Sequence, residues 1–411
     1  MARNIVICCD GTNNEFGEEN TNVVRLIQSL DRTPGKQLLY YDPGIGTLPE
    51  PSTIMAVQKW TRKVIELAFG AGLIPKVLEA YSFLMNYWEP GDQVFLFGFS
   101  RGSYTVRVLA GMLHQMGLLP HGSSNMLPYA VRLYKSIRNA VPDSSNKYWK
   151  LCNQFRWTFA REVPGNDQRH FPVHFLGLWD TVSSVGWIWE PKTFPFTGHN
   201  PSIQNIWHAV SIDERRAFFR SNLVKKDRNN PTQILEQHWF AGDHSDIGGG
   251  HGDKEGGLWR CAFEWLVEGA YNTGLLLDAG RLQRVLSHAP AKPWAEKKHD
   301  LLAKWWKVAE YIPKKRWNAV EKKYQYRCNH FQSRRIGNGA VIHQTVLLRL
   351  RDQALAYRPP NFSSEFIQYV LDMPNVPDSL TYRHSIPLPP VQVLSPNVRR
   401  QLFPLTNATL G

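Results

Sequence analysis

Short apolar runs alternate with amphipathic stretches over the first 270 residues of the chain. Five apolar runs have the length and the polar boundaries of buried strands: Ile5–Cys9, Leu38–Tyr41, Val94–Phe97, Val173–Trp179 and Gln237–Phe240. Between these runs, apolar residues recur every three or four positions, as they do on one face of a helix. The alternation predicts an α/β fold with a mainly parallel sheet that helices cover on both faces.

The predicted helices occupy the stretches between these strands. Thr21 or Asn22 can cap a helix whose apolar residues share one face. Further helices are predicted at about 55–87, with a glycine-rich interruption at 70–72, at 258–269 and around 282–286. Residues 120–169 are polar and mostly helical in pattern, whereas 187–201 is rich in Trp, Pro, Phe and Gly and predicts a long loop.

The most informative motif follows the third predicted strand and reads Gly98-Phe99-Ser100-Arg101-Gly102. Apolar residues at helical spacing come next, so Ser100 stands on a strand-to-helix turn. Glycines two positions before and after Ser100 remove Cβ atoms that would clash in such a turn. The N-terminus of the following helix favours negative charge beside the hydroxyl. This context predicts a nucleophile elbow with Ser100 as the nucleophile.

A serine nucleophile needs a base and a carboxylate that orients the base. Asp180 follows the fourth predicted strand and His244 the fifth, which gives the order Ser, Asp, His that is typical of α/β-hydrolases. The carboxyl ends of parallel strands meet at one edge of a sheet, so we expect these three residues to lie together. A structural role is the alternative for Asp180 and for His244. His251 is a rival base, and Asp246 is a rival acid or a supporting residue.

The loop after the first strand, Asp10-Gly11-Thr12-Asn13, is the predicted oxyanion loop. Two backbone N–H groups must bind the oxyanion, and we expect one from Arg101 and the other from Gly11 or Thr12. Asp10 would hold the loop by accepting backbone hydrogen bonds.

Composition narrows the class of protein. Hydrophobic residues make up 43% of the chain, which allows a sizeable core. The sequence contains no run of about 18 apolar residues, so we expect no transmembrane helix. The run Ile5–Cys9 is too short for the core of a signal peptide, so we expect synthesis in the cytosol and, for any export, a signal-less route. The five cysteines lack zinc-ligand spacing, and Cys8 and Cys9 are expected to be reduced core residues.

The chain is basic, with a net charge of +13 at pH 7 and a pI near 9.5. This balance favours anionic partners such as phospholipid headgroups, nucleic acid or acidic proteins. Residues 305–317 mix Trp and Tyr with Lys and Arg, a pattern that suits an anionic membrane surface. The alternative for 305–317 is a basic helix whose tryptophans pack on the rest of the protein. Nucleic acid is the least favoured partner, although stacking and charge are both present. The sequence does not indicate an oligomeric state.

The chain resembles an uncharacterised α/β-hydrolase domain family that includes the catalytic domains of type VI secretion phospholipase effectors. The resemblance spans residues 4–270 and implies an α/β-hydrolase fold and, by analogy with the bacterial effectors, a hydrolase of lipid metabolism. It is carried by Cys9-Asp10-Gly11-Thr12-Asn13-Asn14, Thr21-Asn22-Val23-Val24-Arg25-Leu26, Tyr41-Asp42-Pro43-Gly44-Ile45-Gly46-Thr47, Gly98–Gly102, Trp179-Asp180-Thr181-Val182, Asp213-Glu214-Arg215-Arg216 and His244-Ser245-Asp246-Ile247-Gly248-Gly249-Gly250.

We therefore predict an α/β-hydrolase-like catalytic domain over 1–290, with insertions at about 120–169 and 187–201. A basic, aromatic and Pro-rich extension over 291–411 would pack on it or cap it. The expected activity is hydrolysis of carboxylic esters, above all (phospho)lipid esters, through a Ser-His-Asp acyl-enzyme mechanism that needs no cofactor and no metal. Two other functions stay open. One is a metal-dependent phosphoester hydrolase that uses Asp10, Asp180 and Asp246, and the other is a non-catalytic binding protein on a hydrolase scaffold.

Overall fold

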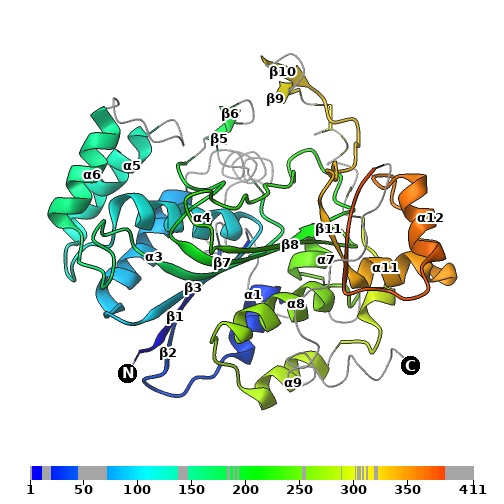
Figure 1. Cartoon of the computed structure of the whole chain (residues 1–411), viewed down its shortest axis with the longest axis horizontal. Coiled ribbons are helices and arrows are strands. Elements are labelled where there is room, and N and C mark those ends of the chain that lie inside the picture. Colours follow the sequence, from blue (N-terminus) through cyan, green and yellow to red (C-terminus); the bar gives the residue numbers. More distant parts are fainter. Residues whose placement is uncertain are drawn as a thin grey trace, which may run out of the picture. The chain divides into compact units, whose positions relative to one another are not determined.

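Figure 1 shows the computed structural model of the chain. The chain divides into two compact units. Unit 1 comprises Met1–Glu15, Asp31–Ile206 and Asn222–Leu235, and unit 2 comprises Phe16–Leu30, Trp207–Ser221 and Glu236–Gly411. The described residues are 2–11, 20–44, 72–137, 147–182, 186–187, 190–191, 194–251, 256–287, 289–300, 302, 307, 310–311, 313–318 and 323–384. Residues 55–71 of the helix predicted at 55–87 lie outside these residues, as do 305–306, 308–309 and 312 of the aromatic and basic segment 305–317.

An eight-stranded sheet runs through the fold in the order β12-β11-β8-β7-β4-β3-β1-β2. Strand β1 pairs in parallel with β2 and β3, β3 with β4, and β8 with β11, whereas β11 and β12 are antiparallel. The predicted α/β-hydrolase-like class with a mainly parallel sheet is therefore confirmed. The strands are β1 Asn4–Cys9, β2 Gln37–Asp42, β3 Gln93–Phe99, β4 Val173–Trp179, β7 Ile203–Ser211, β8 Ile234–Phe240, β11 Val341–His343 and β12 Ser379–Thr381.

Strand β1 shows why this region reads as an unbroken apolar run. Ile5 and Ile7 pack into a core with helices α3 (Leu73–Tyr87) and α4 (Arg101–Met116). Val6 and Cys8 point to the opposite face and are also fully buried. A strand that is covered on both faces has no polar alternation, which is the pattern expected for parallel sheets. The thiol of Cys8 is free, as the sequence suggested.

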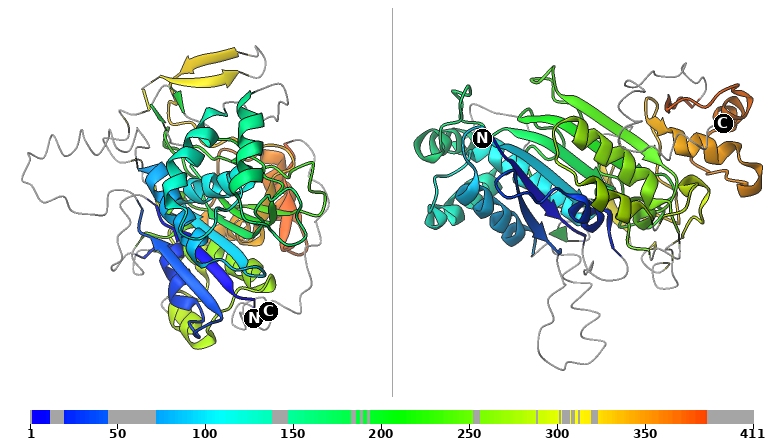
Figure 2. Two further views of the ribbon diagram at one scale, coloured as in Figure 1. Left: turned by 90° about the vertical axis from the view of Figure 1, so that its left-hand side faces the viewer. Right: turned by 90° about the horizontal axis from the view of Figure 1, so that it is seen from below.

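Helix α4 contacts many of the other elements of unit 1. It contacts β1, β3 and β4, and α3 packs beside it. The insertion predicted at 120–169 is helical: α5 (Leu127–Ser136) follows a short 3-10 turn, η1 (Ser124–Met126), and packs with α6 (Lys147–Phe159) against α4 (Figures 1 and 2). In the predicted loop, Gly186–Trp187 (β5) and Glu190–Pro191 (β6) form a two-stranded pair, and residues 194–201 have no helix or strand.

Unit 2 holds the remaining described helices and the C-terminal strands. Thr21 caps α1 by accepting a hydrogen bond from the Val24 N–H at 3.3 Å. The helices are α1 Asn22–Ser29, α7 His244–Gly248, α8 Trp259–Asn272, α9 Ala279–Ser287, α11 Gln344–Arg351 and α12 Ser364–Asp372, with 3-10 turns η2 Pro293–Ala295 and η3 Gln353–Leu355. Strands β9 (Lys314–Asn318) and β10 (Lys323–Arg327) form the gold hairpin in Figure 2.

Strands β7, β11 and β12 are absent from the sequence-based prediction. Strand β7 contains the polar residues Asn205 and His208, both of which are buried. These polar residues interrupt the apolar run by which a buried strand is recognised in a sequence. Strands β11 and β12 are three residues long, too short for a periodicity argument. They belong to the C-terminal region, which thus extends the sheet in addition to packing α11 and α12 on a core that includes Leu347 and Phe366. Among the described residues, no helix has the length and apolarity needed to cross a bilayer.

Candidate active site

Ser100 occupies the turn between β3 and α4, and its backbone is strained. Its φ is 58° and its ψ is −119°, a conformation that non-glycine residues rarely adopt. Such strain persists only where the surroundings enforce it, and it is concentrated at functional sites. The Ser100 N–H donates a hydrogen bond to the carbonyl oxygen of Trp179, the last residue of β4, at 3.0 Å.

The two glycines of the motif are required by close backbone packing. A Cβ at Gly98 would lie 2.5 Å from the Ser103 nitrogen, and a Cβ at Gly102 would lie 2.1 Å from the Cys9 carbonyl oxygen and 2.5 Å from that of Asp10. These neighbours are main-chain atoms, which cannot rotate away as a flexible side chain can. Gly98 therefore allows the turn to fold back closely on the start of α4, and Gly102 allows it to pack against the end of β1.

Ser103 is a supporting residue that the sequence analysis missed. Its Oγ lies 2.6 Å from the carbonyl oxygen of Gly98 and 3.0 Å from that of Trp179, and its side chain is fully buried. The hydroxyl thus links the end of β3 to the end of β4. A small polar residue in the first turn of a buried apolar helix was the available signal.

Asp180 directly follows β4 and is completely buried. Its φ of 38° is also in the left-handed region, so the chain turns sharply there. The Val182 N–H lies 3.5 Å from the carbonyl oxygen of Ser100. The carbonyl oxygen of Thr181 accepts a hydrogen bond from the Asn222 N–H at 3.1 Å. Arg107 of α4 donates to the Asn222 carbonyl oxygen at 2.6 Å. These contacts hold the segment after β4 beside the backbone of Ser100.

The predicted oxyanion loop begins at Asp10, which is buried at the end of β1. Asp10 Oδ1 accepts a hydrogen bond from the Gly11 N–H at 2.7 Å, and Oδ2 accepts from the Tyr41 hydroxyl at 3.2 Å. A Cβ at Gly44 would lie 2.2 Å from the Gly11 carbonyl oxygen, so the Asp-Pro-Gly turn packs directly on this loop. Because the Gly11 N–H is engaged by Asp10, Thr12 is the better candidate for the second donor, and Thr12 lies outside the described residues.

Arg101, the predicted source of the first oxyanion donor, begins α4. Burial lowers the pKa of its guanidinium to about 10, so the group stays positively charged at neutral pH. Its charge adds to the positive end of the α4 dipole. Both fields favour negative charge near Ser100.

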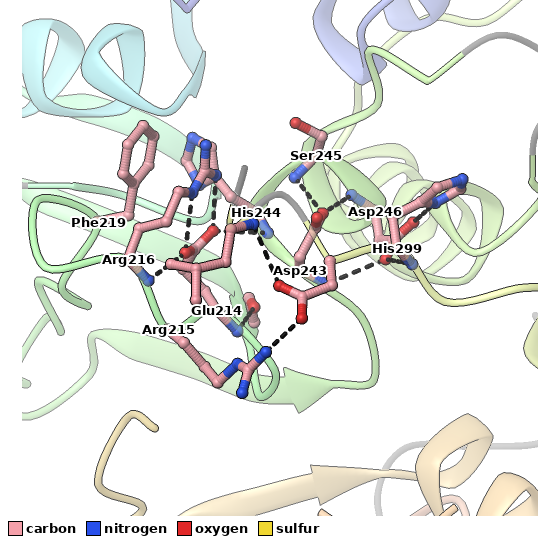
Figure 3. Close-up of polar contacts among 12 residues, drawn as sticks. Glu214, Arg215, Arg216, Phe219, Asp243, His244, Ser245, Asp246 and His299 are labelled. Carbon is pink, nitrogen blue, oxygen red and sulfur yellow. Dashed lines mark hydrogen bonds and ion pairs between the residues drawn. The ribbon is translucent and has the colours of Figure 1, made fainter. Parts of the chain in front are cut away.

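His244 begins helix α7, which follows the end of β8 at Phe240 after a short turn, and lies in unit 2. The turn before it is a capping box: Asp243 Oδ1 accepts from the N–H groups of Ser245 and Asp246 at 2.9 Å, and Asp246 Oδ2 accepts from the Asp243 N–H at 3.0 Å (Figure 3). These reciprocal bonds satisfy N–H groups that the helix leaves open. They fix the backbone on which the His244 side chain stands.

The Asp213–Arg216 segment frames His244. Arg216 pairs with Glu214 through two bonds, of 3.0 Å from Nε to Oε1 and 2.7 Å from Nη2 to Oε2. Glu214 Oε2 lies 3.4 Å from the His244 backbone nitrogen. The Phe219 ring, which Arg216 covers at 3.7 Å, meets the imidazole edge to face at 4.9 Å (Figure 3). The Asp213–Arg216 motif, to which the sequence analysis gave no role, thus supports the predicted base His244.

Residues at the start of α1 bind the end of α7 and the glycine-rich loop that follows it. Asn22 Nδ2 donates to the Ile247 carbonyl oxygen at 2.9 Å, and Thr21 forms a β-bridge with Gly249. Gly249 has a φ of 78°, and a Cβ there would lie 2.6 Å from Arg25 Nη1. The Thr21–Leu26 motif and the glycine run after His244 are therefore two parts of one packing arrangement.

The predicted residues fall into both units. Ser100 and Asp180, the oxyanion candidates Gly11 and Arg101, and the supporting residue Asp10 belong to unit 1. His244, Asp246 and His251 belong to unit 2. The joining of Ser100, Asp180 and His244 into one triad stays a prediction.

Among the described residues, the group whose donor atoms lie close enough to share a metal ion consists of Asp246, His251 and His299. Neither Asp10 nor Asp180 belongs to that group. This placement does not support the carboxylate set of the alternative phosphoester hydrolase.

A polar cavity of about 640 Å³ in unit 1 is lined by His114, Arg156 and His170, among others. His114 is in the last turn of α4, whereas Ser100 precedes its first turn. At 1.5 Å per residue the two ends lie about 20 Å apart, so this cavity is not the substrate pocket of Ser100.

Comparison with known proteins yields one family and several relatives. A model of the catalytic domain of the type VI secretion system phospholipase effector Tle1-like proteins matches residues 3–269. An uncharacterized protein of Saccharomyces cerevisiae is 35% identical over 225 residues, which cover 53% of this chain and 32% of the relative. The chain thus spans about a third of that relative's length, and the similarity is not confined to bacteria.

Two solved structures are more distant. An uncharacterized protein from Pseudomonas aeruginosa aligns with a TM-score of 0.43 and 18% identity over 71% of this chain and 49% of the other. The Tle1 effector bound to the VgrG spike of the type VI secretion system aligns with a TM-score of 0.33 and 17% identity over 61% and 52%.

Proposed function

The chain belongs to the Tle1-like catalytic-domain family of type VI secretion phospholipase effectors, and we propose that it is a serine hydrolase that cleaves carboxylic esters of lipids. The observation that carries this proposal is the strained backbone of Ser100, at φ 58°, on the turn between β3 and α4. That conformation is the one a nucleophile elbow requires. Gly98 and Gly102 stand where any larger residue would clash with main-chain atoms.

In the proposed reaction, Ser100 Oγ attacks the ester carbonyl carbon while the imidazole of His244 takes the hydroxyl proton. The backbone N–H of Arg101 and one N–H of the loop after β1, that of Thr12 or Gly11, bind the oxyanion. His244 then delivers the proton to the leaving alcohol as the ester C–O bond breaks, which leaves an acyl group on Ser100. Asp180 orients the imidazole and stabilises its charged form.

Deacylation restores the enzyme. A water molecule attacks the acyl carbon, His244 takes a proton from that water, and the acid leaves as the proton returns to Ser100 Oγ. Every bond change is accounted for by these three side chains and water, so the mechanism requires no cofactor. The positive Arg101 side chain and the net charge of +13 favour anionic lipid surfaces as the place of action.

The test is active-site labelling of the full chain with a fluorophosphonate probe, together with release of fatty acid from phosphatidylglycerol vesicles. We expect stoichiometric labelling that is lost in Ser100→Ala and retained in Ser136→Ala, whose hydroxyl binds a carbonyl of its own helix. Asp180→Asn and His244→Ala should slow both labelling and hydrolysis.

Two results would overturn the proposal. Full ester hydrolysis by Ser100→Ala would exclude the nucleophile. Activity on a phosphoester that a chelator abolishes, in a protein that the probe leaves unlabelled, would favour a metal-dependent phosphoester hydrolase instead.

A further inference from the structure

We propose that Asp246, His251 and His299 form a Zn²⁺-binding site in unit 2, beside the helix that carries His244. One donor atom from each of the three side chains lies within 4.8 Å of the others. The site goes beyond the proposed ester hydrolysis, which uses no metal. It also gives a role to two residues that the sequence singled out only as rival members of the catalytic site.

The distances between donor atoms suit a small divalent ion. His299 Nδ1 lies 2.8 Å from Asp246 Oδ1, and His251 Nε2 lies 3.9 Å from the same oxygen. Zinc binds nitrogen and oxygen ligands at about 2.0–2.2 Å, which places two ligands of a tetrahedral site about 3.4 Å apart. The two observed distances lie on either side of this value. Two imidazoles and one carboxylate form a ligand set that zinc commonly takes.

The carboxylate is oriented before any ion binds. Asp246 Oδ2 accepts hydrogen bonds from the backbone N–H of Asp243 at 3.0 Å and from that of His299 at 3.1 Å. These bonds leave Oδ1 as the oxygen that faces the imidazoles of His251 and His299. Figure 3 shows the His299 side chain beside the Asp246 carboxylate. Backbone donors that hold a ligating carboxylate in place are typical of metal sites.

The buried Nε2 atom of His251 gives separate support for a metal site. This nitrogen has no hydrogen-bond partner among the described residues, and it lies 3.6 Å from Asp243 Oδ1, beyond hydrogen-bond length. Asp243 Oδ2 is likewise buried without a partner within the described part of the chain. Leaving such atoms unpaired costs free energy, which a shared cation would offset. The ring centroids of His251 and His299 lie 3.8 Å apart, and one nitrogen of each ring lies within 4 Å of Asp246 Oδ1. Asp243, whose Oδ1 lies 3.6 Å from His251 Nε2, is a candidate for a fourth ligand.

The position of the site indicates a structural role. Asp246 is two residues after His244 on α7, so an ion at Asp246 would stabilise the helix that presents the predicted base. His299 lies outside residues 3–269, the part that matches the family model. The ion would therefore fasten the C-terminal region of this chain to the α7 loop.

The test uses the full chain and Zn²⁺ alone. We expect isothermal titration and metal analysis to show one Zn²⁺ per chain, and His251→Gln and His299→Gln each to weaken binding by roughly tenfold or more. His121→Gln, at an exposed histidine, should bind as the parent does. Ser100→Ala should also bind Zn²⁺ fully, so a failure of the proposed hydrolase leaves this result unchanged.

A readout on the unaltered chain guards against variants that fail to fold. Co²⁺ in place of Zn²⁺ should give the visible absorption of a tetrahedral site with nitrogen ligands, and added Zn²⁺ should abolish it. The proposal is wrong if the parent chain binds neither ion, or if folded His251→Gln and His299→Gln, checked by circular dichroism, bind Zn²⁺ as tightly as His121→Gln.

Discussion

The backbone N–H of Ser100 donates a hydrogen bond to the carbonyl oxygen of Trp179 at 3.0 Å. This bond joins the predicted nucleophile to the residue that directly precedes Asp180. The two candidate catalytic residues of unit 1 therefore stand on adjoining strand ends, and both have a positive φ. Changes that loosen this junction should affect catalysis without contacting the substrate.

Ser103→Ala should lower the free energy of unfolding by about 1–3 kcal/mol, because it removes the hydroxyl that two buried carbonyls share, those of Gly98 and Trp179. We also expect a lower kcat with a nearly unchanged KM, since the elbow loses a support and no substrate contact. Urea denaturation and steady-state kinetics measure the two effects. Thr105→Val is the control, because the Thr105 hydroxyl donates to a carbonyl of its own helix, that of Arg101. Equal losses in both variants would contradict the assigned role.

Gly102→Ala should destabilise the protein by about 3 kcal/mol or more and remove most of the hydrolase activity. The added methyl would lie 2.1 Å from the Cys9 carbonyl oxygen, so either β1 or the elbow must move. Thermal unfolding followed by circular dichroism measures the loss. Gly198→Ala, where a Cβ meets nothing within 4 Å, should stay within about 0.5 kcal/mol of the parent. A fully stable and active Gly102→Ala would rule out the tight packing of the elbow on β1.

Arg216→Lys should reduce kcat roughly tenfold while KM changes little. Lysine cannot reproduce the two parallel bonds that hold Glu214 beside the His244 backbone, nor the planar stacking on Phe219. Arg215→Lys is the matched control, because Arg215 pairs with the exposed Asp300 at the surface. Steady-state hydrolysis of a soluble ester compares the two. If the control lost as much activity as Arg216→Lys, the framing of His244 would not explain the effect.

His170 should make the free energy of unfolding depend on pH below neutrality. Burial, with a smaller contribution from Arg156, lowers the pKa of its imidazole to about 4, against about 6.5 in the unfolded chain. Between these values the unfolded state binds the proton and the folded state does not, so stability falls as the pH drops from about 6.5 towards 4. The expected loss is on the order of 2 kcal/mol.

The measurement is urea unfolding at several pH values between 4.5 and 7.5. His170→Asn keeps a donor near the His114 carbonyl, which the imidazole approaches at 2.6 Å, and should show a flatter pH dependence than the parent. His121→Asn should follow the parent. Identical slopes for the parent and His170→Asn would show that this imidazole does not control the acid response.

The local pattern of the sequence was sufficient for the fold class and the elbow. Apolar runs that are buried on both faces, such as Ile5–Cys9, reveal parallel strands because no polar alternation interrupts them. The Gly98–Gly102 motif can also be recognised in the sequence, because the conformation of a tight turn depends on its own few residues. The order of Ser100, Asp180 and His244 along the strands also comes from local signals.

Only the tertiary structure decided which distant groups support these residues. The strained φ of Ser100, the shared hydroxyl of Ser103 and the pairing of Glu214 with the backbone of His244 depend on contacts across the fold. His299 and Asp246 meet although 53 positions separate them. Periodicity reports which side of a strand or helix is buried, but not which residue lies opposite. For that physical reason the sequence identified the candidate chemistry, and the packing determined how each group is held.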